Sequence, residues 1–131
     1  MEDIDQAIEL ANMIDVNTHK YGALGDICKI LSTRGNIDQA IKLADTILDD
    51  DYLKTEALRN IIEILLEKER IGQAIELANK APNDYLKSLA LQDISNTLLK
   101  NGNIERAIEV ANTIPDVDEK STALQDIHKT L

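Results

Sequence analysis

Hydrophobic residues follow a helical spacing through most of the chain. In the segment 37–48 they stand at positions i, i+3, i+4, i+7, i+10 and i+11, namely Ile37, Ala40, Ile41, Ala44, Ile47 and Leu48. This spacing places them on one stripe of an α-helix. Continued along the chain, the pattern predicts eight helices, at about residues 3–14, 18–33, 37–48, 52–68, 71–80, 85–100, 104–113 and 118–130.

Two short phrases recur with a period of 33 or 34 residues. Ala-Ile stands at 7–8, 40–41, 74–75 and 107–108, and Ala-Leu stands at 23–24, 57–58, 90–91 and 123–124. Repetition at this period is typical of helical repeat arrays. The pattern predicts an all-α fold and one repeat domain over residues 1–131. Its units are about 1–17, 18–50, 51–83 and 84–116, and a terminal helix covers 117–131.

Two kinds of turn alternate between the predicted helices. The turn between Ala-Leu and the next Ala-Ile has constant length and contains Gly35 in one copy and Gly102 in another. A glycine just past a helix end supplies a left-handed residue at little steric cost. Glu69 stands at this position in the third copy, where we expect the same backbone geometry with strain. The other turn varies in length, with one extra residue in 48–52.

Each predicted helix that contains the Ala-Ile phrase carries two alanines four residues apart. The pairs are Ala7 and Ala11, Ala40 and Ala44, Ala74 and Ala78, and Ala107 and Ala111. Small side chains on one face let a neighbouring helix approach closely. We therefore interpret these alanines as packing residues, without a chemical role.

The composition agrees with a helical protein and excludes several functions. The chain has no Phe or Trp and three Tyr, so Ile, Leu and Ala must fill its core. A net charge of −10 argues against nucleic acid and against anionic lipid, and it makes RNA-reading helical repeats improbable. The apolar run 61–66 is too short to span a membrane.

The single cysteine and the N-terminal segment favour a cytoplasmic protein. Cys28 has no second cysteine with which to form an intramolecular disulfide, which suits a reducing compartment. The segment 1–10 is acidic and lacks the basic and apolar regions of a secretory signal.

The sequence contains no recognisable catalytic arrangement. No nucleophile–base motif, metal-ligand spacing or phosphate-binding loop is present, and His19 and His128 lie far apart. Cys28 stands beside Ile27 and Ile30 and is interpreted as a small buried hydrophobic residue. We therefore expect no enzymatic activity, no catalytic residues, no metal site and no cofactor.

The segment 99–111, LKNGNIERAIEVA, resembles the centre of a tetratricopeptide repeat. The matching positions are Leu99, Gly102, Ile104, Glu105, Ala107 and Ile108, and again Gly35, Ile37, Asp38, Ala40 and Ile41. The chain departs from that family in its large aromatic residues, since Leu91, Leu98 and Ala111 replace them. The family's small residue in the first helix appears as Cys28 and Ser95 but as Ile62 in the middle copy.

The resemblance implies a right-handed α-solenoid of four helix–turn–helix repeats that binds a peptide or partner helix on its concave face. In that family the first helix of each unit lines the concave face. Carried over by position, eleven side chains point to it: Asp26, Lys29, Arg59, Asn60, Glu63, Gln92, Asp93, Asn96, Gln125, Asp126 and Lys129. The alternative is a solvated helix face with local pairs such as Asp26–Lys29 and Asp126–Lys129.

Two recurring residue types have competing interpretations. A lysine recurs at Lys20, Lys54, Lys87 and Lys120. These lysines either form a row that faces anions, or their stems cover apolar surface or their ammonium groups pair with nearby carboxylates. Tyr52 and Tyr85 occupy equivalent positions, and we expect packing between repeats rather than ligand stacking.

A second functional hypothesis is self-assembly. The segment 4–14 resembles an internal copy, so we expect its apolar residues to lack an upstream helix to cover them: Ile4, Ile8, Leu10 and Met13. Either the chain is part of a longer array, or the N-terminal helix pairs with another molecule in a homo-oligomer. The segment 121–131 has a narrower apolar stripe and is able to cap an array.

Overall fold

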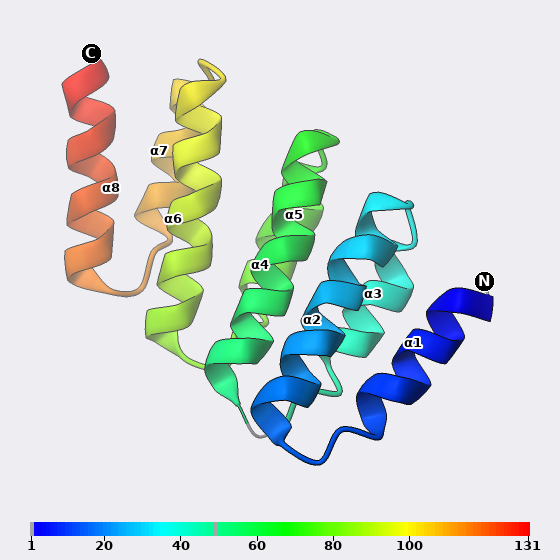
Figure 1. Cartoon of the computed structure of the whole chain (residues 1–131). Coiled ribbons are helices and arrows are strands. Elements are labelled where there is room, and N and C mark those ends of the chain that lie inside the picture. Colours follow the sequence, from blue (N-terminus) through cyan, green and yellow to red (C-terminus); the bar gives the residue numbers. More distant parts are fainter. Residues whose placement is uncertain (1, 49) are drawn as a thin grey trace. The chain divides into compact units, whose positions relative to one another are not determined.

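The computed structural model describes residues 2–48 and 50–131, and Glu2 by its backbone alone. These residues form eight α-helices and no strand, which confirms the all-α prediction. The helices are α1 (Glu2–Asn12), α2 (Asn17–Thr33), α3 (Ile37–Ala44), α4 (Asp51–Glu67), α5 (Ile71–Ala78), α6 (Asp84–Lys100), α7 (Ile104–Asn112) and α8 (Val117–Thr130) (Figure 1).

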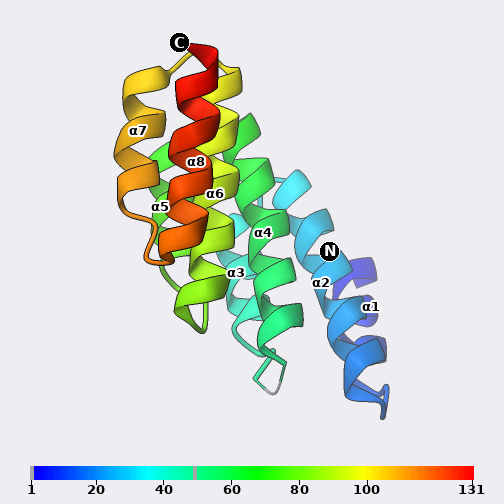
Figure 2. The ribbon, with the colours of Figure 1, turned by 90° about the vertical axis from the view of Figure 1, so that its left-hand side faces the viewer.

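The chain divides into two compact units, Met1–Ile64 and Leu65–Leu131, and the boundary falls within α4. In the first unit α1 packs on α2, and α2 packs on α3. In the second unit α6 packs on α5 and α7, and α8 lies against both α6 and α7 (Figure 2). A single repeat domain over residues 1–131 therefore stays a prediction.

The second helix of each pair ends earlier than its apolar stripe predicts. α3 ends at Ala44 although Ile47, on the same stripe, is fully buried. The side chain of Thr46 donates a hydrogen bond to the Leu43 carbonyl at 2.6 Å, and its own N–H bonds the same carbonyl. A threonine bound back to the preceding turn competes with helix continuation. The chain therefore leaves the helix while its next apolar residue still reaches the core.

The constant-length turn has the same geometry in three copies. The N–H groups of Asn36, Arg70 and Asn103 bond the carbonyls five residues earlier, at 2.8, 2.9 and 2.9 Å. This bond satisfies a terminal carbonyl of the first helix and needs a left-handed residue just before its donor. Gly35 has φ 87°, Gly102 has φ 81°, and Glu69 has φ 59°. The predicted strained geometry of the third turn is confirmed.

Replacing Glu69 with glycine is expected to stabilise the protein by about 1 kcal/mol, because glycine adopts positive φ without a steric penalty. The free energy of unfolding in urea measures this gain. The matched reverse change is Gly102→Ala, which should cost a similar amount, since a Cβ there meets nothing within 4 Å and the effect is one of backbone alone. A Glu69→Gly variant no more stable than wild type would contradict the strain.

The variable-length turn ends in a capping side chain in three of the four copies. Asp50 Oδ1 accepts the Leu53 N–H at 2.9 Å, Asn83 Oδ1 accepts the Leu86 N–H at 2.9 Å, and Asp116 Oδ1 accepts the Glu119 N–H at 3.1 Å. Such a bond satisfies an N–H group that the first turn of a helix leaves unpaired. The equivalent residue before α2 is Val16, which has extended backbone angles but no acceptor. The extra residue of this turn falls within 48–52, and Asp49 of that segment lies outside the described residues.

Replacing Val16 with asparagine is expected to stabilise the protein by about 1 kcal/mol, because it supplies the missing cap without changing the net charge. Val16 is exposed, so the substitution removes no core contact. The shift of the urea midpoint measures the effect. Val16→Ala is the control, since alanine has no acceptor, and equal stability of the two variants would argue against capping.

Seven of the eight paired alanines are buried, as the packing interpretation predicts, and Ala7 is half-buried. Ala40, Ala44, Ala107 and Ala111 are completely buried. The close approach lets side chains of the first helix reach the backbone of the second: Ser95 Oγ donates to the Ala107 carbonyl at 3.0 Å, and Cys28 Sγ donates to the Ala40 carbonyl at 3.4 Å. Small polar residues on the first helix thus fasten it to the second helix of the same pair.

The N-terminal helix is better covered than the sequence suggests. Ile4 is buried and Ile8 is half-buried, whereas Leu10 and Met13 are exposed. Ile4 is thus buried without an upstream helix, and the expectation that such a helix is missing stays a prediction. An isolated end helix still has one apolar neighbour, since α1 packs on α2, and Ile4 belongs to the part of the stripe that this single contact shields.

Candidate binding face of the first helices

The eleven predicted binding residues all lie on first helices, and we call them the first-helix face. Within the first unit they are Asp26 and Lys29 on α2 and Arg59, Asn60 and Glu63 on α4. Within the second unit they are Gln92, Asp93 and Asn96 on α6 and Gln125, Asp126 and Lys129 on α8. Each of these side chains is exposed or half-buried. All eleven are therefore accessible to solvent, and their contact with a partner stays a prediction.

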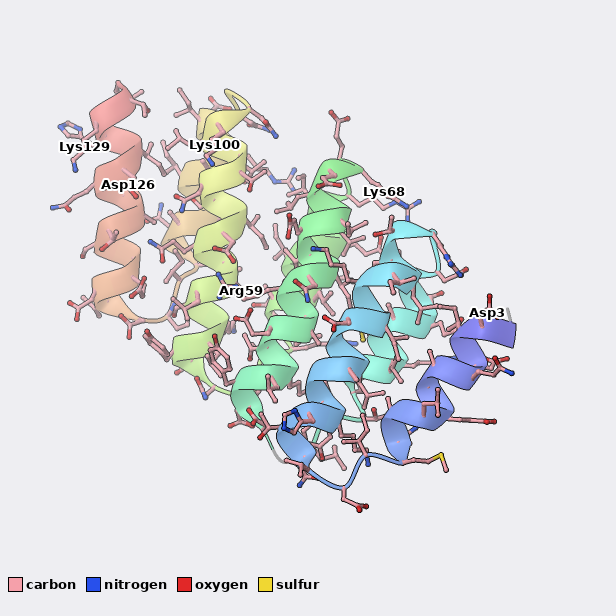
Figure 3. All side chains as sticks on the ribbon, viewed as in Figure 1. Asp3, Arg59, Lys68, Lys100, Asp126 and Lys129 are labelled. Atoms are coloured by element: carbon pink, nitrogen blue, oxygen red, sulfur yellow. The ribbon has the colours of Figure 1, made fainter. Side chains whose placement is uncertain are left out.

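The second unit brings two sets of these residues onto packed neighbours. α6 and α8 lie against each other, and both carry the set at the same register, 33 residues apart. Gln92 corresponds to Gln125, and Asp93 corresponds to Asp126. Figure 3 shows Asp126 and Lys129 together on the last turns of α8. The two helices therefore present parallel rows of an amide and a carboxylate, groups that accept and donate hydrogen bonds to a peptide backbone.

The first unit adds an ion pair and an exposed isoleucine to the face. Arg59 donates a hydrogen bond to the Glu56 carboxylate at 3.2 Å, one turn earlier on α4, in a partly exposed ion pair of modest strength. On α2 the exposed side chain of Ile30 follows Asp26 by one turn, and sequence reasoning did not include it. The sequence indicates its exposure, because Ile30 is an apolar residue outside the stripe of buried positions Leu24, Ile27 and Leu31.

The recurring lysines favour the covering interpretation. All four residues are half-buried: Lys20, Lys54, Lys87 and Lys120. The backbone N–H group of each bonds the carbonyl of the residue that precedes its helix, at 2.9 Å. Lys20 Nζ lies 6.0 Å from the centre of the Tyr21 ring. Stems that lie along the surface and heads that reach solvent explain this partial burial.

The paired tyrosines do not pack as expected. Tyr52 and Tyr85 are 62% and 55% exposed, although each lies in the first turn of its helix. Burial between repeats is therefore not the reason for their recurrence. Exposed aromatic rings with a hydroxyl are available to a partner surface.

Cys28 is a buried structural residue. Its side chain is completely shielded from solvent, as the sequence interpretation predicts. Burial raises the pKa of the Cys28 thiol to about 12, and the hydrogen bond with the backbone opposes this only in part. The neutral thiol that results is a poor nucleophile. No group of three metal-ligating side chains forms among the described residues.

Comparison with known proteins gave no significant match to any family model, curated protein or solved structure. Within the described part of the chain, no helix has both the length and the apolar character needed to cross a membrane.

Proposed function

We propose that the chain is a tetratricopeptide-like α-solenoid and acts as a non-enzymatic, cytoplasmic scaffold. Its first-helix face binds an extended peptide or a helix of a partner protein. The observation that carries this proposal is the recurrence of one structural unit: the same turn with positive φ at Gly35, Glu69 and Gly102, and the same capped first helix at Asp50, Asn83 and Asp116. Units repeated with this fidelity present equivalent side chains at a regular interval.

The chemistry of the first-helix face supports a peptide ligand. Amide and carboxylate groups on successive first helices match the donors and acceptors of an extended backbone. The exposed side chain of Ile30 and the exposed Tyr52 and Tyr85 supply the apolar and aromatic contacts that binding surfaces use. The acidic charge of the whole protein opposes binding to nucleic acid, so a protein partner is the better fit.

A selected peptide tests the proposal without knowledge of the natural partner. Peptides that bind the wild-type chain are isolated from a displayed random library, and their affinities are measured by calorimetry. The affinity is then compared for Asn60→Ala in the first unit and Asn96→Ala in the second. Glu109→Ala, an exposed change on the second helix α7, is the matched control.

We expect at least one of the two asparagine variants to weaken binding about tenfold, a loss typical of a hydrogen-bonding contact at an interface. Glu109→Ala should leave the affinity within about twofold. Backbone NMR shifts on titration should cluster in α2, α4, α6 and α8. Shifts confined to α3, α5 and α7, or a loss of affinity only in the Glu109 variant, would locate the binding surface elsewhere.

A further inference from the structure

The helices α3, α5 and α7 occupy equivalent places in the repeat, and α5 differs from the other two at both of its ends. Each of the three follows a first helix through the constant-length turn, and each is followed by another first helix in the chain. Each also contains a pair of buried alanines, which in α5 are Ala74 and Ala78. The three helices can therefore be compared residue by residue, and none of them is a terminal helix.

The apolar residue that anchors the chain just past the helix is missing after α5. Ile47 follows α3, Ile114 follows α7, and both are buried. The equivalent residue after α5 is Ala81, which is only half-buried. An isoleucine removed from water stabilises a fold more than an alanine that stays partly in water, because it buries more apolar area. The C-terminal end of α5 therefore has the weakest attachment of the three.

The start of α5 lacks the residue type that favours a helix in the other copies. The second residue of α3 is Asp38 and that of α7 is Glu105, whereas that of α5 is Gly72. A carboxylate in the first turn interacts favourably with the helix dipole, and α5 has no acidic residue in its first turn. Glycine also loses the most conformational freedom when it enters a helix. The first turn of α5 is therefore the least stable of the three.

The α4–α5 copy also lacks two features that hold the other copies together. Its turn places Glu69 at φ 59°, where the other two turns have glycine. In those copies the first helix donates a side-chain hydrogen bond to the second, from Cys28 and from Ser95. Ile62 stands at the equivalent position of α4, and although it is buried its side chain has no hydrogen-bond donor. The bond that fastens the other pairs is therefore not available to α5.

We propose that α5 is a local opening element: residues 71–81 unfold reversibly while α6, α7 and α8 stay folded. The missing anchor, the weak first turn, the strained entry and the lost hydrogen bond all lower the free energy of opening at this one helix. Proteins open first where buried apolar contacts are fewest. Because α5 packs on α6 within the second unit, its opening uncovers part of the α6 surface (Figure 2). This inference does not use the peptide-binding proposal, so either can fail alone.

Hydrogen exchange of the wild-type chain measures this opening. The second buried alanine of each helix provides three equivalent amides, at Ala44, Ala78 and Ala111. We expect the Ala78 amide to exchange at least tenfold faster than either of the others, after correction for intrinsic rates. Its rate should also depend less on low concentrations of urea, since a local opening exposes little surface. An Ala78 amide that is protected as well as either equivalent, or the same urea dependence at all three, would overturn the proposal.

An exchange of residues between α5 and α7 tests whether the first turn controls the opening. Gly72→Glu gives α5 the residue of α7, and the new side chain has room because a Cβ at Gly72 meets nothing within 4 Å. We expect the Ala78 amide to exchange about fivefold more slowly in this variant. Glu105→Gly is the matched reverse change at an exposed position, and it should speed the exchange of Ala111 by a similar factor. An unchanged rate at Ala78 in the first variant would contradict opening through this turn.

Thiol labelling gives an independent readout of the same opening. Ala78→Cys and Ala111→Cys are made in a Cys28→Ser background, so that each protein has one thiol, and circular dichroism checks that both are folded. Both alanines are buried, so a thiol reagent reaches the new cysteine only when its helix opens. We expect the cysteine at position 78 to react at least tenfold faster than the cysteine at position 111. Equal rates would mean that both positions are reached by unfolding of the whole second unit, and would overturn the proposal.

Discussion

The free energy of unfolding is expected to fall as the pH rises from 9 to 12, because Cys28 keeps its proton in the folded protein. The thiol has an ordinary pKa of 9.0, and burial raises its pKa to about 12. Below pH 9 both the folded and the unfolded chain hold the proton, so Cys28 causes no change. Between these values only the unfolded chain releases it, which favours unfolding by about 1.4 kcal/mol per pH unit and about 4 kcal/mol across the interval.

Cys28→Ser is the control for this effect. Serine does not titrate in this range, and Ser95 shows that a hydroxyl at the equivalent position reaches the carbonyl of the second helix, at 3.0 Å. Urea unfolding at pH 8 and at pH 10.5 should therefore show wild type losing about 2 kcal/mol more than the variant. Equal losses in the two proteins would mean that other groups, such as lysines and tyrosines, cause the alkaline destabilisation.

The helices and turns were predictable because the same pattern of residues recurs in four copies along the chain. A single amphipathic segment leaves its ends uncertain, but four copies fix the register of each residue against three others. This comparison identified Glu69 as the residue that must adopt positive φ, although its own side chain gives no such signal. The same comparison also distinguishes Val16, which has no side-chain acceptor, from its equivalents Asp50, Asn83 and Asp116, whose side chains cap their helices.

The other differences between the predicted and the observed helices have physical causes that the spacing of apolar residues does not reveal. An apolar residue at the right interval indicates burial and not helical hydrogen bonding, so the stripe of α3 continues to Ile47 after the helix has ended at Ala44. Burial also depends on which neighbour is present. Ile4 is covered by the contact of α1 with α2, while Leu10 on the same helix is exposed.

The exposure of the first-helix residues was predictable from the sequence, but a ligand class was not. Exposure follows from the register, and each of the eleven predicted residues is at least partly accessible. Their mixture of amides and of both charges specifies no single ligand class. The exposed Tyr52 and Tyr85 show the same limit, because a tyrosine's amphipathic ring fits a packed interface and a solvent-facing surface equally well.

Replacing Ala107 with leucine is expected to destabilise the protein by about 1–3 kcal/mol, because the larger side chain overpacks the contact between α6 and α7. Ala107 is completely buried, and its carbonyl accepts the hydrogen bond of Ser95, so the two backbones have no room to separate without losing that bond. Urea unfolding of the variant at low protein concentration measures the loss, since dilution keeps any association of molecules out of the measurement.

Ala7→Leu makes the same chemical change at the equivalent position of α1, which packs on α2 alone among the described helices, whereas α7 packs on both α6 and α8. Ala7 is only half-buried, so a leucine there should cost less than about 0.5 kcal/mol, the size of an ordinary surface change. Alanine and leucine have similar helix propensities, and the difference between the two variants therefore reports packing alone. Equal losses at positions 7 and 107 would show that the alanines are not there to admit a neighbouring helix, and would contradict the packing interpretation of the alanine pairs.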